Sequence, residues 1–89
     1  MHPKLFKTDD PFTNTEAAAK ELIRLCKAEM EQANRSFAYT GTVNFTFIYD
    51  GGSTPASYGA GRDYAINKGW LTIDESGSRI MITPEGEDA

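Results

Sequence analysis

The stretch 53–86 constrains the fold most, because its stop and turn signals occur in a fixed order. Thr54-Pro55 is a strong helix start: Thr caps, and Pro suits the first helical position, where the missing N–H has no partner to lose. Gly69 is a C-terminal stop. Two short apolar runs, 70–73 and 79–83, then flank a Ser-Gly turn, as in a β-hairpin. The pattern therefore predicts a helix followed directly by a hairpin.

The helix predicted from Thr54 to Lys68 has an inward face of small and apolar residues, namely Tyr58, Gly61, Ala65 and Ile66. Gly59 and Gly61 lower its intrinsic helix propensity by roughly 1 kcal/mol each. We expect both glycines to allow close approach of a neighbouring helix.

An earlier helix is predicted to begin at Thr13. Glu16 follows three residues later, which is the spacing of a capping box, and Phe12 precedes the cap as a hydrophobic staple requires. Strong helix formers fill 17–22, and the helix should end near 34–36. Its inward face at helical spacing comprises Ala18, Leu22, Leu25, Cys26, Met30 and Ala33.

The segment Val43–Tyr49 is ambiguous by its own pattern. Its alternating β-branched and aromatic residues favour a strand. Val43 and Phe47, together with Ile48, also suit one face of a short helix. We further expect a short strand at 37–40, a break at Thr40-Gly41-Thr42 and a turn at Asp50-Gly51-Gly52.

Length and composition fit one folded domain. The chain has 89 residues, 39% of them hydrophobic, and a net charge of −4. We expect a flexible arm at 1–12, a single domain at 13–86 and an acidic tail at 87–89. No signal peptide or membrane span is evident. The single cysteine, Cys26, cannot form an internal disulfide, so a cytoplasmic location is expected.

The residues "YAINKGWLTIDESGSRIMITPEG" resemble the end of a recognition helix and the wing of a winged-helix domain, a variant of the helix-turn-helix. The chain is also similar to small uncharacterised bacterial proteins with "YTG-x-x-N", "GGS" and "GRDYAI-x-x-GW" stretches. The resemblance implies an α+β fold, with a three-helix core followed by a C-terminal β-hairpin wing. It favours a helix at 43–49, between the other two.

Winged-helix DNA binders place the third helix in the major groove of double-stranded DNA and the wing on the backbone. Such a resemblance implies a transcription regulatory role. Phosphate donors would lie at the start of this helix, and further contacts along it and on the wing. The implied nucleic-acid-binding residues are Ser53, Thr54, Ser57, Arg62, Tyr64, Asn67, Lys68 and Arg79.

The charge pattern keeps a second function open. Only three basic residues lie in 53–82, and three acidic residues oppose them. A strong nucleic-acid binder usually has a clear basic patch. The alternative is therefore a protein–protein interaction module, with another protein or a second copy as its partner. No nucleophile–base pair, metal cluster or cofactor motif is visible, so an enzyme is not expected.

Several residues also have purely structural interpretations. Arg62, Asp63 and Lys68 suit a solvated helix face, and Trp70 suits a core position between the wing and the first helix. The aromatic residues Phe45, Phe47 and Tyr49 are expected to belong to the core rather than to a surface for stacking bases.

Overall fold

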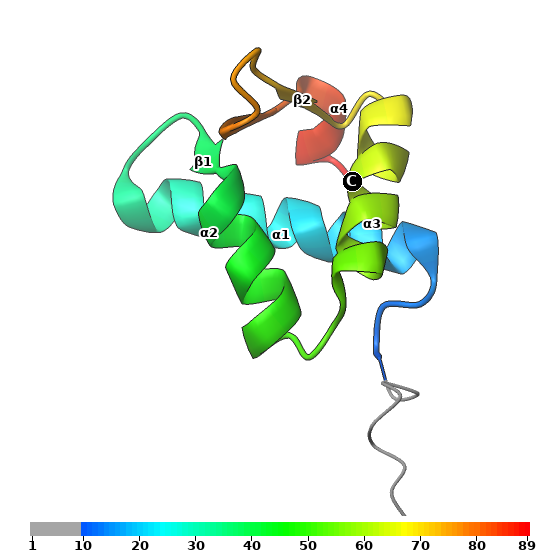
Figure 1. The fold of residues 1–89 in the computed structure, drawn as a ribbon. Helices are drawn as coiled ribbons and strands as arrows, with labels where there is room; N and C mark the ends of the chain where they lie inside the picture. Colours follow the sequence, from blue (N-terminus) through cyan, green and yellow to red (C-terminus); the bar gives the residue numbers. More distant parts are fainter. Residues whose placement is uncertain (1–9) are drawn as a thin grey trace, which may run out of the picture.

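The computed structural model describes residues 10–89 and shows an α+β fold (Figure 1). Most of the arm predicted at 1–12 lies outside the described residues. The elements, in chain order, are α1 (Thr15–Ala33), β1 (Ala38–Tyr39), α2 (Thr40–Phe45), the π-helical segment η2 (Thr46–Asp50), α3 (Pro55–Asn67), β2 (Leu71–Ile73), β3 (Arg79–Ile82) and α4 (Pro84–Glu87).

Helix α1 begins one residue later than the capping-box pattern predicts. Asn14, not Thr13, is the N-cap, and its side chain accepts a hydrogen bond of 2.9 Å from the backbone N–H of Ala17. Asn ranks above Thr as an N-cap residue, which accounts for the shift. The predicted end is confirmed, because Asn34 takes the left-handed conformation (φ 57°) that closes the helix.

The ambiguous segment is helical. The chain changes from strand to helix at Thr40, within the predicted break Thr40-Gly41-Thr42, but these three residues are themselves helical because α2 and η2 run continuously from Thr40 to Asp50. Val43 and Phe47 are both only 1% exposed. They lie four residues apart, and a helix brings such residues onto one face, whereas a strand would also have placed Phe45 on that face. The helix therefore lets Val43 and Phe47 enter the core together and leaves Phe45 outside it.

α1 and α3 cross closely at Gly61. A Cβ on Gly61 would lie 2.9 Å from the Cβ of Ala18, while Gly59 has only an Arg62 side-chain atom within 4 Å, at 3.9 Å. Close approach is thus confirmed for Gly61 and wrong for Gly59. Tyr58 and Ala65 are buried as predicted. The predicted burial of Ile66 is wrong, because this residue directly follows Ala65 and the helix turns its side chain away from the buried face, leaving it 41% exposed.

A three-stranded antiparallel sheet in the order β1-β3-β2 packs beside the helices. Ile80 is fully buried at its centre and pairs with both Ala38 and Ile73. The predicted turn at 74–78 joins β2 to β3. The hairpin rises above the helices in Figure 1.

A last short helix follows β3. It is the single-turn helix α4, capped by Thr83, whose hydroxyl accepts from the backbone N–H of Gly86 at 3.0 Å. Gly86 packs so tightly on the backbone of Trp70 that any side chain there would collide with it. Trp70 itself is partly buried against the core and lies 5.7 Å from the Tyr64 ring on α3. Its aromatic neighbour is therefore on α3.

The last residues of the predicted arm are fixed against the domain. Phe12 packs on Phe47, with ring centroids 5.2 Å apart, and Asp10 is 9% exposed. The staple pattern indicated that Phe12 packs, but no signal in the sequence indicated Phe47 as its neighbour or the burial of Asp10.

We predict opposite effects for alanine at the two α3 glycines. Gly61→Ala should lower the free energy of unfolding by about 1–3 kcal/mol, because its methyl group collides with Ala18 and Ala19. Gly59→Ala, the matched control, should raise it by about 0.5–1 kcal/mol, since a helical glycine is replaced where space is open. Urea unfolding measures both changes. Equal changes in the two variants would contradict the close crossing of α1 and α3.

Candidate functional site

The start of α3 is occupied by a carboxylate of the chain itself. Asp10 accepts hydrogen bonds from the hydroxyls of Ser53 (2.8 Å), Thr54 (3.2 Å) and Ser57 (2.8 Å). The backbone N–H of Phe12 donates to the same side chain at 2.9 Å. The positive end of the helix dipole favours an anion at this position.

This arrangement bears on three of the predicted DNA-binding residues. Ser53 is 2% exposed, and the hydroxyls of Ser53, Thr54 and Ser57 all donate to Asp10. The geometry that was predicted to hold a DNA phosphate thus holds an internal carboxylate. The sequence signal for anion binding was present, but the anion lies 43 residues earlier in the chain.

The hydrogen bonds outweigh burial in setting the pKa of Asp10. Burial alone would raise this pKa, but the donors from Phe12, Ser53, Ser57 and Thr54 stabilise the charged form, and the net shift is downward. The carboxylate is therefore charged at neutral pH and acts as an anionic clamp between the chain before α1 and the start of α3.

The remaining predicted residues lie along α3 and on β3. Arg62 pairs with the adjacent Asp63 at 3.2 Å, and Lys68 lies 5.9 Å from the centre of the half-buried Tyr64 ring. Asn67 is exposed at the end of α3. Arg79 stacks on Phe37, its guanidinium 5.0 Å from the ring centre. The eight predicted DNA-binding residues therefore do not form one surface cluster, because they contact different parts of the protein.

Most basic side chains of residues 10–89 are paired with carboxylates. The ion pairs are Lys20–Glu16, Arg24–Glu21, Lys27–Glu87, Arg35–Glu29 and Arg62–Asp63. Within the same range, Lys68 and Arg79 form no ion pair. Little positive charge is thus left to neutralise phosphates.

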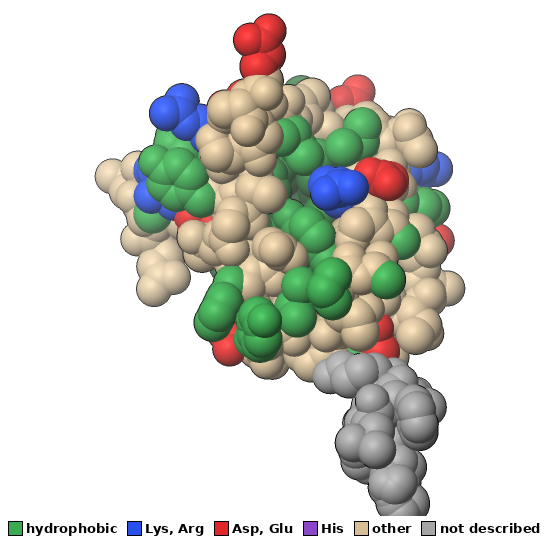
Figure 2. All heavy atoms as spheres, viewed as in Figure 1, with side chains coloured by type: hydrophobic (Ala, Val, Ile, Leu, Met, Phe, Trp, Pro, Cys, Tyr) green, Lys and Arg blue, Asp and Glu red, His purple; other side chains and the backbone are tan. Residues whose placement is uncertain are grey.

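Two aromatic side chains are exposed on α2 and η2. Phe45 is 60% and Tyr49 71% exposed, and their rings contact each other in a tilted arrangement, with centroids 4.8 Å apart and an interplanar angle of 38°. Their predicted place in the core is wrong, whereas Phe47 between them is buried as expected. The helical alternative already carried this signal, because Phe45 and Tyr49 share a helix face that excludes Val43 and Phe47. In Figure 2 hydrophobic side chains gather over the lower end of the helical segment formed by α2 and η2.

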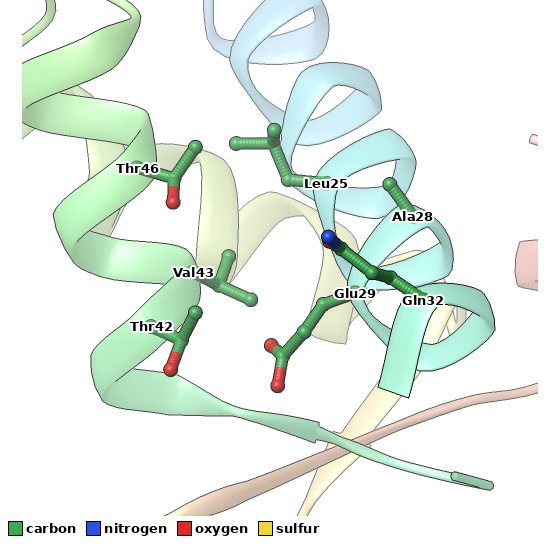
Figure 3. Close-up of a pocket in the computed structure, with 7 residues that line it drawn as sticks. All are labelled: Leu25, Ala28, Glu29, Gln32, Thr42, Val43 and Thr46. Atoms are coloured by element: carbon green, nitrogen blue, oxygen red, sulfur yellow. The ribbon is translucent and has the colours of Figure 1, made fainter. Parts of the chain in front are cut away.

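A hollow of about 130 Å³ lies between α1 and α2, near the aromatic pair. Figure 3 shows the side chains that line it, from both helices: Leu25, Ala28, Glu29, Gln32, Thr42, Val43 and Thr46. Thr42 is one helical turn from Phe45 and Thr46 one turn from Tyr49, so the hollow and the aromatic pair adjoin on α2 and η2. We call these two features together the α1–α2 face.

Glu29 is the unusual residue of this face. One carboxylate oxygen, Oε2, accepts from the Arg35 guanidinium and, at 3.3 Å, from the backbone N–H of Tyr39. The other, Oε1, is buried and has no hydrogen-bond partner among the described residues. Buried polar atoms are nearly always satisfied, so this oxygen is available to a hydrogen-bond donor from outside the described residues. No motif in the sequence marks Glu29.

Cys26 has no features of a catalytic nucleophile. It is fully buried on α1, and burial raises the pKa of its thiol to about 12, with a further contribution from Glu29. The thiolate is the reactive form of cysteine, so this side chain is inert at neutral pH. Within residues 10–89, no group of three metal-binding side chains comes together and no helix is long and apolar enough to cross a membrane.

A scan against protein-family models, a search of curated proteins and a search of solved structures each found no match to this chain.

We predict that Asp10→Ala lowers the free energy of unfolding by about 1–3 kcal/mol, because it leaves the buried Ser53 hydroxyl and the Phe12 N–H without their acceptor. Asp50→Ala, which removes an exposed carboxylate, should change stability by about 0.5 kcal/mol or less. Chemical unfolding of both variants provides the comparison. An unchanged free energy of unfolding in Asp10→Ala would show that the clamp does not stabilise the fold.

The clamp also predicts a pH dependence. The pKa of Asp10 is lower in the folded than in the unfolded chain, so the unfolded chain takes up the proton first as pH falls. The stabilisation is complete above the unfolded pKa of about 3.9 and is lost as pH falls through the folded pKa. The stability difference between wild type and Asp10→Asn should therefore shrink as pH falls from about pH 5 to about pH 2 in unfolding measurements. A constant difference would contradict this assignment.

Proposed function

We propose that this chain is a winged-helix domain that acts as a protein–protein interaction module and not as an enzyme. Its binding site is the α1–α2 face. The observation that carries the proposal is the exposed pair of Phe45 and Tyr49, whose two large aromatic rings contact each other and lie mostly in water.

The winged-helix assignment is supported by the order of the elements. α1, a short strand, α2, α3 and a β-hairpin follow one another, and β1 pairs with β3 at the edge of the hairpin. In this scheme α3 is the recognition helix, and the β2–β3 hairpin is the wing.

Exposed aromatics of this kind favour a protein partner. Aromatic side chains are enriched in the cores of protein interfaces, where they supply much of the binding free energy. The π-helical turn that presents Tyr49 adds support, because such turns occur frequently at functional sites. The hollow beside the pair offers a partner side chain a place to insert.

The surface of α3 is less suited to a DNA duplex. Its first hydroxyls donate to Asp10, Arg62 is paired with Asp63, and Ile66 is exposed. Affinity for DNA comes largely from phosphate neutralisation, which needs free cations. The charge of −4 on the chain opposes the approach of a polyanion.

Binding of double-stranded DNA is the second candidate. Lys68 at the end of α3 and Arg79 on the wing are the basic residues of the described chain that form no ion pair with a carboxylate. They lie on the two elements with which winged-helix proteins contact DNA. Two such cations would give weak binding with a steep salt dependence.

We predict that peptides selected from a random phage-displayed library on the wild-type chain bind about tenfold more weakly, or worse, to the double variant Phe45→Ser/Tyr49→Ser. Both side chains are exposed, so the variant should keep its fold, which thermal unfolding checks. Lys68→Ala, at the C-cap of α3, is the control and should bind as wild type. A mixed-sequence DNA duplex at low salt should cause no amide NMR shifts on α3.

Two results would count against the module. Equal binding of the selected peptides to wild type and double variant would remove the aromatic pair from the site. Shifts on α3 and Arg79 that shrink as salt rises would favour the DNA candidate.

If wild type self-associates in sedimentation and the double variant does not, the protein partner is a second copy of the chain.

A further inference from the structure

We propose that the hollow between α1 and α2 is a pocket for a cationic side chain, lysine or arginine, carried by a protein partner beside an apolar residue. The cation pairs with Glu29, and the apolar residue packs on Phe45 and Tyr49. Because this inference rests on the proposed function, its experiment uses a different ligand and different variants.

The charge of the pocket comes from Glu29. Its side chain is 14% exposed, and it shares one oxygen between Arg35 and Tyr39 while Oε1 has no partner among the described residues. Figure 3 shows the carboxylate extending from α1 toward α2. Because Oε1 is buried, a donor in the hollow reaches it only after the carboxylate rotates about its terminal torsion, which is broad in glutamate. A buried carboxylate gains most from a charged donor.

The rest of the lining suits the stem and head of a basic side chain. Leu25, Ala28 and Val43 offer apolar contact to a methylene chain, while Thr42, Thr46 and Gln32 add hydrogen-bonding groups near the mouth. A cavity of about 150 Å³ holds a benzene molecule, so about 130 Å³ accommodates an ammonium or guanidinium head with part of its stem. Lysine and arginine bury their stems in this way.

Charge complementarity identifies the partner as basic. The chain carries a net charge of −4, and exposed Asp50 directly follows Tyr49 in η2. A basic segment is attracted to this face, and an acidic one is repelled. The aromatic pair next to the pocket provides the apolar part of the contact.

The experiment is an NMR titration of the full chain with N-acetyl-arginine amide and N-acetyl-lysine amide. N-acetyl-citrulline amide, which has a similar shape but no charge, is the matched ligand control. We expect shifts of Leu25, Ala28, Glu29, Thr42, Val43 and Thr46 with at least one cation and none with citrulline. Glu29→Gln should weaken binding about tenfold, because a neutral acceptor replaces a charged one.

A second variant guards against a folding defect in Glu29→Gln, whose Arg35 contact also changes. Ala28→Leu fills the hollow from an exposed helical position without removing a hydrogen bond, and should abolish the shifts. Ala17→Leu, also exposed on α1 but outside the hollow, should leave them intact.

Three results would overturn the pocket: no shifts with either cation, equal shifts with citrulline, or shifts that persist in Ala28→Leu. Peptide binding that depends on Phe45 and Tyr49, but not on Glu29 or Ala28, would leave the interaction module standing and remove the cation pocket. Cation binding at the hollow without any such peptide would do the reverse.

Discussion

The close crossing of α1 and α3 at Gly61 sets the positions of the other elements. With no side chain at Gly61, α3 lies against the backbone of Ala18 and Ala19. Tyr58 and Ala65 then reach the core on either side of the crossing, and the chain leaving α3 enters the hairpin through Trp70. α2 and η2 fill the space that remains beside α1, with Val43 and Phe47 inward. Their outward face follows from this packing.

The Asp10 clamp adds a second constraint to the same region. It connects the segment before α1 to the start of α3 by hydrogen bonds to three hydroxyls, while Phe12 packs on Phe47 from η2. Both contacts join parts of the chain that are distant in sequence. They also fix the N-terminus of α3 as a place where an anion is already bound, which changes what this helix can offer to a ligand.

Local signals in the sequence were sufficient for much of the fold. The cap at Thr54, the stop at Gly69 and the turn at 74–78 act through the backbone of their own neighbours, and they occur as predicted. The pattern failed where a distant contact decided the outcome. Asp10 and Ser53 lie 43 residues apart, and nothing local marks their pairing. The hollow of the α1–α2 face was missed for the same reason, since Glu29 and Thr42 come to line it only through tertiary packing.

The two candidate functions differ in which half of the molecule they use. A duplex would contact α3 and the β2–β3 hairpin, where the described cations are few and an internal carboxylate occupies the helix start. A protein partner would contact α1 and α2, where exposed aromatics adjoin a hollow lined by a carboxylate with one oxygen unpaired among residues 10–89. An exposed ring and an unpaired buried acceptor both cost free energy in the isolated chain. A partner with an apolar residue and a cation relieves both costs at once, so the surface chemistry favours the protein partner.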